Sequence, residues 1–385
     1  MIPLPRGPVF WVVLCLAGMV STTRAQEPGT DRDAGGFLRA LPGRPIELPA
    51  DHGDHPETRT EWWYLTGPLE AADGRRFGFQ ATWFRRGLVL ERSAERSPMA
   101  ARDVMLFHGA LTDVTAGRLH HGELASRAWP GWAGAAEGRL DVRLLNQTLV
   151  DATGDGRTAR MVFDAGEAHL ELDLDLAASP VLRHGAEPGL SLKGAEPGQA
   201  SWYYTLPAIG VRGRLVLPDG EELAVSGRAW MDHEFGSSQL GADQVGWDWF
   251  STVLDDGTVL MAYLLRRSDG SADVTSSGTL LLPDGTSRHL PQDALEIVVR
   301  DHWTSPASGA RYPAAWTLRV PSADLELDVT PLLDDQELIT ATTGVTYWEG
   351  LCRFNGRRGE RPVEGAGYVE LVGYGGSVAD RFGGR

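Results

Sequence analysis

The stretch Ala168-His169-Leu170-Glu171-Leu172-Asp173-Leu174-Asp175-Leu176 alternates apolar and polar side chains without a break. Successive side chains of a β-strand point to opposite faces, so this alternation predicts a strand with one face in the core and the other in water. Turns with glycine separate further strand-like stretches, as in Pro218-Asp219-Gly220, Asp256-Gly257 and Pro283-Asp284-Gly285. We expect at most one short helix, over residues 332–339. The sequence therefore predicts an all-β protein.

Four sequence landmarks occur twice in the same order, which indicates an internal repeat. They are an aromatic stretch followed by a turn and a strand ending in two arginines, a Gly-x-Leu stretch, a Leu-Glu-Leu-Asp stretch, and a closing stretch. The pairs are Glu61-Trp62-Trp63-Tyr64 with Trp247-Asp248-Trp249-Phe250, Gly109-Ala110-Leu111 with Gly278-Thr279-Leu280, Leu170-Glu171-Leu172-Asp173 with Leu325-Glu326-Leu327-Asp328, and Val225-Ser226-Gly227-Arg228-Ala229-Trp230-Met231-Asp232 with Val363-Glu364-Gly365-Ala366-Gly367-Tyr368-Val369-Glu370. One match alone is weak, but four in one order predict a duplicated β unit.

The repeat divides the chain into two β domains, with the boundary between Gly236 and Gly246. We assign residues 48–238 to the first domain and 239–385 to the second, with a flexible lead-in over residues 26–47. Each domain has enough strands to close into an antiparallel barrel, which removes exposed sheet edges. A barrel of about eight strands leaves room for one apolar ligand. A β-sandwich is the alternative architecture.

Residues 1–25 have the pattern of a secretory signal peptide: Arg6, an apolar run over residues 9–20, and small residues before a cut after Ala25. The apolar run is short for a membrane span. We therefore expect a protein exported to the periplasm or secreted, with no transmembrane segment after cleavage.

The charge of the chain is strongly acidic, with 36 Lys and Arg against 52 Asp and Glu and a formal net charge of −16. Cleavage after Ala25 removes two arginines, which leaves 34 basic against 52 acidic residues and a net charge of −18. This charge disfavours nucleic acid as a partner. Cys352 is the one cysteine beyond the predicted cut, so the mature chain has no intramolecular disulfide.

The residues with chemical potential gather in tryptophan-rich stretches and near histidines. His52 and His55, together with His233 and Glu234, leave a metal site open, but their spacing is not diagnostic, and we predict neither a metal nor a cofactor. Glu61 could have a structural role instead of a chemical one, either accepting hydrogen bonds from indole N–H groups or pairing with Arg85. No Gly-x-Ser-x-Gly stretch occurs, which excludes a conventional α/β-hydrolase.

Several of these stretches resemble the AttH family, which is related to the carotenoid 1,2-hydratases (hydroxyneurosporene synthases, CrtC). The resemblance rests on His55, Glu61-Trp62-Trp63-Tyr64, Gln80, Trp83-Phe84-Arg85, Trp202-Tyr203-Tyr204, Trp230-Met231-Asp232-His233-Glu234 and Trp247-Asp248-Trp249. It covers roughly residues 49–374. It implies two lipocalin-like barrels side by side and, in many bacterial members, export and proximity to envelope ABC transporters. Some members are described as secreted hydrolases.

A hydratase of this type needs an acid in a dry pocket, because protonation of an alkene makes a carbocation that water then captures. A carboxyl group kept protonated by burial can give the proton, and aromatic faces stabilise the cation. We name Asp232 as the candidate proton donor, with His233 and Glu61 as further candidate catalytic residues. The candidate ligand-binding residues are Trp62, Trp63, Tyr64, Gln80, Arg85, His108, Tyr204, Trp230, Trp247, Trp249 and Tyr263.

One feature departs from the hydratases. Their second half is expected to carry an acidic residue shortly after a tyrosine, whereas Tyr263 is followed by Leu264-Leu265-Arg266. Carotenoid itself is therefore disfavoured as the substrate.

Three functions stay open at this point. We expect an exported protein that binds a hydrophobic isoprenoid or lipid, as a carrier linked to an ABC transporter. The alternative is an enzyme, either a hydratase of the carotenoid 1,2-hydratase type or a secreted lipid hydrolase. The third option is an interaction protein whose barrels are filled by side chains. Asp232 and Glu61 facing one cavity would favour the enzyme, and ion pairs away from a cavity would favour the carrier.

Overall fold

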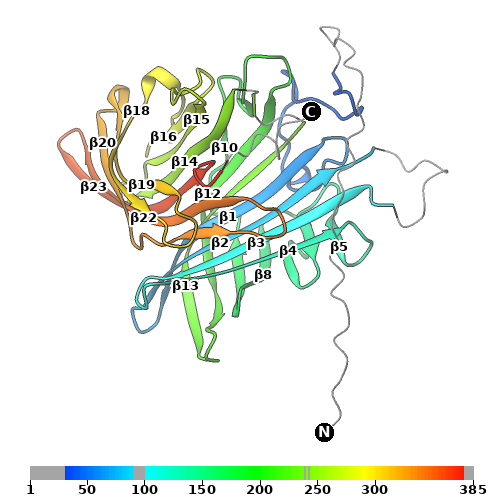
Figure 1. Cartoon of the computed structure of the whole chain (residues 1–385), viewed down its shortest axis with the longest axis horizontal. Coiled ribbons are helices and arrows are strands. Elements are labelled where there is room, and N and C mark those ends of the chain that lie inside the picture. Colours follow the sequence, from blue (N-terminus) through cyan, green and yellow to red (C-terminus); the bar gives the residue numbers. More distant parts are fainter. Residues whose placement is uncertain (1–30, 91–99, 238–239, 242, 377–385) are drawn as a thin grey trace. The chain divides into compact units, whose positions relative to one another are not determined.

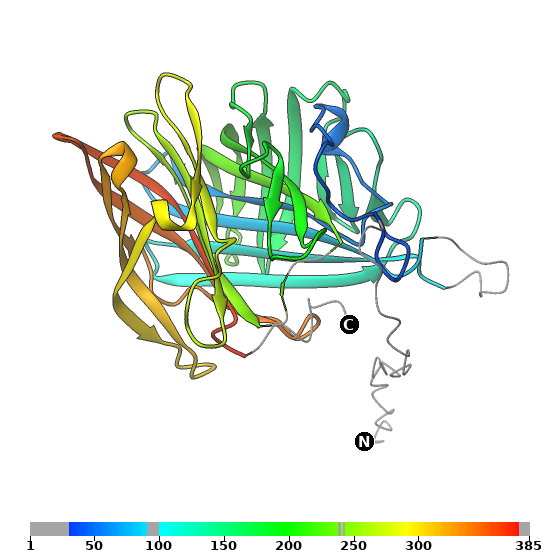
Figure 2. The ribbon, with the colours of Figure 1, turned by 90° about the horizontal axis from the view of Figure 1, so that it is seen from above.

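Two antiparallel sheets hold nearly all regular structure of the computed structural model, which describes residues 31–90, 100–237, 240–241 and 243–376. One sheet is a nearly closed barrel and the other a half-barrel, which confirms the predicted all-β, tandem-barrel fold. Figure 1 labels most of their strands, and Figure 2 shows that both sheets are strongly curved. The predicted signal peptide lies outside the described residues.

The first sheet contains thirteen strands within the described residues, in the order β4-β3-β2-β1-β13-β12-β9-β8-β7-β6-β5, with β10 and β11 paired to β12. Their bounds are β1 Thr60–Ala71, β2 Arg76–Gly87, β3 Asp103–Asp113, β4 Arg118–Arg127, β5 Ala133–Ala135, β6 Asp141–Leu144, β7 Gln147–Val150, β8 Thr158–Ala165, β9 Ala168–Asp175, β10 Leu182–Arg183, β11 Leu190–Leu192, β12 Ala200–Val216 and β13 Glu222–Gly236.

The second sheet contains ten strands in the same described part of the chain, in the order β17-β16-β15-β14-β23-β22-β20-β19-β18, with β21 paired to β22. Their bounds are β14 Gln244–Leu254, β15 Val259–Arg267, β16 Ser277–Leu281, β17 Ser287–Pro291, β18 Glu296–Thr304, β19 Arg311–Val320, β20 Leu325–Pro331, β21 Glu337–Ile339, β22 Thr346–Arg358 and β23 Arg361–Val372. Three single-turn 3₁₀ helices complete the described regular structure: η1 Ala50–His52, η2 Gln292–Ala294 and η3 Pro321–Ala323.

The two strand orders show the predicted duplication. In each sheet the first strand of the repeat pairs with the last, β1 with β13 and β14 with β23, and the next two strands follow on the same side. The four sequence landmarks occupy corresponding strands: β1 and β14, β3 and β16, β9 and β20, β13 and β23. The change from one sheet to the other falls between Gly236 and Gln244.

Strand alternation decides which side chains reach the second sheet. Along β1, Trp63 and Leu65 point into the core of the first barrel, while Trp62 and Tyr64 join a second apolar cluster that also contains residues of β14, β22 and β23. Close approach of the sheets requires glycine at position 78, because a Cβ there would lie 2.5 Å from Tyr368 Oη. The sheets therefore pack through a shared, largely aromatic layer.

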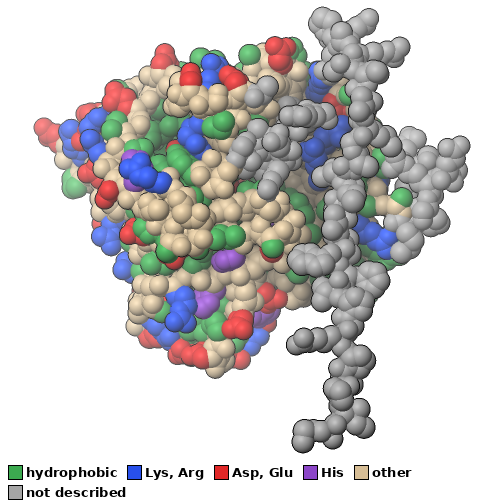
Figure 3. All heavy atoms as spheres, in the orientation of Figure 1, with side chains coloured by type: hydrophobic (Ala, Val, Ile, Leu, Met, Phe, Trp, Pro, Cys, Tyr) green, Lys and Arg blue, Asp and Glu red, His purple; other side chains and the backbone are tan. Residues whose placement is uncertain are grey.

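Alternation also places charge on the outside. The outward side chains of β8 and β9 are exposed or partly exposed, and acidic and basic groups are interspersed over the face seen in Figure 3. In the described chain, no helix has the length and hydropathy required to cross a bilayer.

Two expectations about local structure were wrong. Residues 31–47 of the predicted flexible lead-in pack against the first barrel: Phe37 is 1% exposed, Ile46 belongs to the barrel core, and the Leu38 amide donates to the Glu57 carbonyl at 2.7 Å. Residues 332–339 contain the short strand β21 instead of a helix, because Glu337–Ile339 pair with β22. Apolar packing orders the first segment, and pairing with β22 outweighs local helix preference in the second.

Candidate active site

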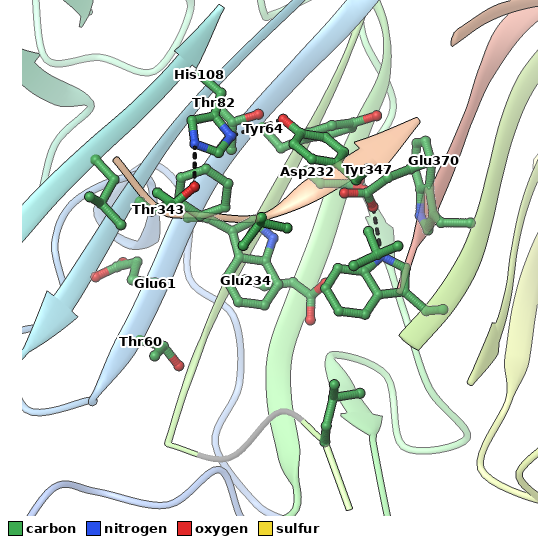
Figure 4. Close-up of a pocket in the computed structure, with 18 of the residues that line it drawn as sticks. Thr60, Glu61, Tyr64, Thr82, His108, Asp232, Glu234, Thr343, Tyr347 and Glu370 are labelled. Atoms are coloured by element: carbon green, nitrogen blue, oxygen red, sulfur yellow. Dashed lines mark hydrogen bonds between the residues drawn. The ribbon is translucent and has the colours of Figure 1, made fainter. Parts of the chain in front are cut away.

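A cavity of about 230 Å³ lies between the two sheets, on the outer face of the first barrel. Strands β1, β2, β3, β12 and β13 supply one wall, and β14, β15, β22 and β23 supply the other (Figure 4). Its lining residues are Thr60, Glu61, Trp62, Tyr64, Gln80, Thr82, Phe84, Arg85, Arg86, Leu106, His108, Lys193, Tyr203, Asp232, Glu234, Leu240, Trp247, Trp249, Tyr263, Leu265, Thr343, Val345, Tyr347, Glu370 and Val372.

The sequence left open whether a ligand would lie inside one barrel or between the two. The inside of the first barrel is a packed core that includes Trp63, Phe77, Phe79, Trp83 and Phe107, each at most 1% exposed. Large aromatic side chains from neighbouring strands fill the space that a ligand would need. The ligand site is therefore shared by the two repeats.

Asp232 on β13 points into this cavity and is 4% exposed. Tyr203 Oη donates to its Oδ2 at 2.5 Å, Trp230 Nε1 donates to Oδ1 at 2.7 Å, and the Thr205 hydroxyl also donates to Oδ1. Burial raises the pKa of Asp232 to about 7, against the opposing effect of these three donors. Both hydroxyl partners can also accept, so hydrogen bonding accommodates the carboxylate and the carboxylic acid.

The second sheet contributes two more carboxyl groups, Glu349 and Glu370, which face each other across the β22–β23 ladder. Glu370 lines the cavity and accepts from Trp247 Nε1 at 2.7 Å. Burial raises the pKa of Glu370 to about 7, and burial together with Glu370 holds the pKa of Glu349 well above its usual range. Both effects therefore favour the protonated form of Glu349.

Aromatic rings surround these acids. Trp249 makes edge-on contacts with Tyr64, at 5.3 Å between ring centroids, and with Trp230, at 5.9 Å. Trp249 Nε1 also donates to Tyr203 Oη at 3.2 Å. Such rings stabilise a positive charge in a desolvated space.

A buried ion pair forms one end of the cavity wall. Lys193 Nζ lies 3.0 Å from Glu234 Oε2, and the Ser201 hydroxyl donates to the same carboxylate. Lys193 also lies over the rings of Tyr203 and Tyr263, at 5.1 and 4.5 Å. Burial alone would lower the pKa of Lys193, but the Glu234 carboxylate raises it, so the ammonium stays charged.

Neutral polar groups form another part of the wall. His108 Nδ1 lies 2.9 Å from Tyr347 Oη, and burial lowers the pKa of His108 to about 4. Gln80 Nε2 donates to Thr82 Oγ1 at 2.5 Å, while Gln80 Oε1 has no partner among the described residues. Figure 4 shows His108, Thr82, Tyr347 and Asp232 in the same part of the site. A ligand donor could bond the unpaired Gln80 oxygen.

Glu61 lines the same cavity as Asp232, but its carboxylate is held by neighbouring cationic and histidine side chains. Its carboxylate is fully buried and bonds His55 Nδ1 at 2.7 Å, His233 Nε2 at 2.8 Å and Arg85 Nη2 at 3.0 Å. Burial would raise the pKa of Glu61, but His55, His233 and Arg85 hold it well below its usual range. Figure 4 places Glu61 apart from Asp232 and Glu370. The ion pair with Arg85 is the structural role that the sequence analysis gave as the alternative for Glu61.

The same network contains the cluster with metal-ligand character, formed by His55, Glu61 and His233, whose ligand atoms lie within 4.8 Å of one another. Glu61 and Asp51 raise the pKa of His55 to about 9, although burial acts in the opposite direction. The charged His55 and the Arg85 guanidinium both neutralise the Glu61 carboxylate. The donor set is thus consumed by internal ion pairs, which does not fit a metal.

The remaining residues named from the sequence lie either at the cavity or in the core of the first barrel. Trp62, Tyr64, Gln80, Arg85, His108, Trp247, Trp249 and Tyr263 line the cavity, although the Arg85 guanidinium bonds Asp54, Glu61 and Asp103. Trp63 and Tyr204 belong to the first barrel's core, and His233 is fully buried, stacked on Trp63. Trp230 is not among the lining residues, but it contacts two of them, by its bond to Asp232 and by its ring contact with Trp249. His233, Trp63 and Tyr204 are therefore corrected to structural positions.

Sequence reasoning missed Lys193, Tyr203, Tyr347, Glu349 and Glu370. Tyr203 and Glu370 lie within stretches that the sequence analysis noted. Glu370 occupies the position in the second repeat that corresponds to Asp232, so the repeat could have identified it. Lys193 and Tyr347 lie outside every landmark, so nothing in their sequence context signalled them.

Three comparisons relate this chain to known proteins. The profile of the AttH-like family matches residues 39–374. Kievitone hydratase from Fusarium solani subsp. phaseoli is 22% identical over 236 residues, which cover 60% of this chain and 65% of that protein, just under two thirds of its length. A crystal structure from Nitrosomonas europaea described as an AttH matches with a TM-score of 0.78 and 35% identity, over 88% of this chain and 100% of that one. The structure of kievitone hydratase from Nectria haematococca has a TM-score of 0.66 at 17% identity, over 89% and 98% of the two chains, and shows a shared fold.

Proposed function

This chain belongs to the AttH-like family, and from that premise we propose that it is a hydratase-type enzyme that adds water to a carbon–carbon double bond of a small hydrophobic molecule. The observation that carries the proposal is Asp232: a buried carboxyl group with a pKa of about 7 lines an aromatic cavity and forms no ion pair among the described residues. The relative described as kievitone hydratase supports the reaction class.

In the proposed reaction, Asp232 takes the first step. As a carboxylic acid it donates its proton to one alkene carbon, so that a C–H bond forms and the other carbon becomes a carbocation. Tyr203, Thr205 and Trp230 hold the carboxyl group in place. The faces of Trp249 and Tyr64 stabilise the cation, and water captures it to give an alcohol. General acid catalysis by a positioned group contributes about 10²- to 10⁴-fold.

We propose an isoprenoid or other lipid with a trisubstituted alkene as the substrate class, because such an alkene gives a tertiary cation. The apolar and aromatic residues of the wall, including Phe84, Leu106 and Leu265, suit such a molecule. We further propose export through residues 1–25, tested by the N-terminal sequence of the protein recovered from its own cells.

The second candidate function is a carrier that delivers an apolar ligand, including delivery to an envelope ABC transporter. The observation in its favour is that Glu61, the second acid named from the sequence, lines the cavity with its carboxylate held in ion pairs. A carrier would bind the same ligand class without changing it.

One experiment separates the two functions. Ligand extracted from the purified protein and identified by mass spectrometry is returned to the protein in ¹⁸O-labelled water. We expect wild type to convert the ligand to a product containing ¹⁸O, and Asp232→Asn to bind it but convert it at least about 100-fold more slowly. Asp173→Asn, at an exposed position on β9, is the control. Stoichiometric binding without ¹⁸O uptake by wild type would establish the carrier, and equal conversion by Asp232→Asn would refute its role.

A further inference from the structure

The two repeats meet at the cavity with an approximate internal symmetry. Asp232 and Glu370 end the two copies of the closing landmark and occupy corresponding positions on the corresponding strands β13 and β23. Asp232 lies opposite Tyr64 of β1, and Glu370 lies opposite Trp249 of β14. Both acids line the same cavity, one from each sheet.

Reciprocal hydrogen bonds connect the repeats in the same way. Tyr64 of the first repeat donates to Glu349 Oε1, at 2.5 Å, next to Glu370 in the second repeat. Trp249 of the second repeat donates to Tyr203, at 3.2 Å, and Tyr203 donates to Asp232 in the first. The Tyr64 and Trp249 rings touch each other between these bonds. Asp232 is therefore bonded through Tyr203 to an aromatic donor of the other repeat, and Glu370 lies opposite Glu349, which accepts from such a donor.

The symmetry is broken at one pair of corresponding positions. On the strand next to each acid, Thr205 lies opposite Asp232, whereas Glu349 lies opposite Glu370. Glu349 is 1% exposed, and its Oε2 has no hydrogen-bond partner among the described residues. Burying a carboxylate without a cation costs free energy, so Glu349 favours its protonated form. The negative charge of the pair then resides on Glu370.

We propose that Glu370, beside the protonated Glu349, accepts the proton of the attacking water, so that the repeat-related residues Asp232 and Glu370 form the acid–base pair of the reaction. This inference rests on the proposed hydration. The steps balance: Asp232 loses a proton as the C–H bond forms, water oxygen forms the C–O bond, and Glu370 gains the proton that the water loses. Transfer of that proton back to Asp232 through solvent resets the site.

The experiment compares wild type with Glu370→Gln and Glu349→Gln. Glu364→Gln, at an exposed position on the same strand β23, is the matched control. Infrared difference spectra over a pH series detect protonated carboxyl groups without any substrate. We expect a carboxyl signal that persists well above the pH at which an exposed glutamate titrates and that disappears in Glu349→Gln, and a second signal that titrates near pH 7 and disappears in Glu370→Gln. Wild-type and Glu349→Gln spectra that coincide over the whole pH series would overturn the inference.

The rate measurement uses the same variants, ¹⁸O uptake and the ligand extracted from the protein. We expect Glu370→Gln to lose about 10²- to 10⁴-fold in rate and to lose the limb of the pH–rate profile on which activity rises with pH. Glu364→Gln should keep wild-type rate and profile. If wild type takes up ¹⁸O and Glu370→Gln retains both rate and profile, this inference fails and the hydratase proposal stands. If wild type shows no ¹⁸O uptake, both fail.

Discussion

Replacing Asp232 by asparagine should change the stability of this protein with a sign that depends on pH. Burial raises the pKa of Asp232 from 3.8 to about 7, so the folded state binds a proton more tightly than the unfolded state. The free energy of unfolding therefore falls as the pH rises from 3.8 to 7, and it falls no further, on account of Asp232, above pH 7. A rise of about 3 in the pKa of Asp232 lowers the free energy of unfolding by about 4 kcal/mol at pH 9 and by about 0.5 kcal/mol at pH 4.

Asparagine removes this penalty but also removes hydrogen bonding. Its amide oxygen can still accept from Trp230 and Thr205, while its NH₂ group cannot accept from Tyr203. The lost bond costs about 1 kcal/mol. We therefore expect Asp232→Asn to be more stable than wild type by about 3 kcal/mol at pH 9 and roughly equal or slightly less stable at pH 4.

Urea unfolding of both proteins at several pH values from 4 to 9 measures this difference, provided that the urea dependence of the unfolding free energy is unchanged. Asp173→Asn at an exposed position serves as the control for general charge effects. A stability difference that is the same at pH 4 and pH 9 would refute the reasoning, since it would mean that Asp232 titrates alike in the folded and unfolded states.

Three further predictions concern the scaffold. Arg85→Met should destabilise the protein by about 3–5 kcal/mol in urea unfolding, because it removes a buried cation that Asp54, Glu61 and Asp103 share. Arg85→Lys should restore only part of this loss. Asp51→Asn should destabilise at pH 7 and progressively less as pH falls below 3.8, because Arg44 and His55 lower the pKa of Asp51 against the effect of burial; a loss independent of pH would contradict this. Gly78→Ala should cost about 1–3 kcal/mol, because the new methyl group would clash with Tyr368 and Leu351 where the sheets meet, whereas alanine at exposed Gly74 would test backbone strain alone.

The sequence predicted the fold well because the fold depends on local patterns. Strict alternation at Ala168–Asp175 and glycines with positive φ at positions 220, 257 and 285 are found where they were expected. The repeat also predicted the common strand order of the two sheets, since landmarks in one order require corresponding strands.

The site was only partly predictable, and alternation explains the errors. Glu61-Trp62-Trp63-Tyr64 reads as one cluster, but consecutive residues of a strand point to opposite faces, so Trp62 and Tyr64 reach the cavity while Trp63 enters the core. His233 was separated from Asp232 for the same reason. The position of the cavity could not be predicted, because it depends on how two sheets pack, and no pattern within one strand records that contact.

The shared cavity gives the duplication an evolutionary meaning. An ancestor with a single repeat could have built this pocket only as a twofold-symmetric homodimer, in which every mutation would appear on both walls at once. Fusion of two copies removed that restriction. Asp232 and Glu370, and beside them Thr205 and Glu349, could then diverge independently. Two walls that began as copies could thus carry different side chains at corresponding positions, which two identical chains cannot.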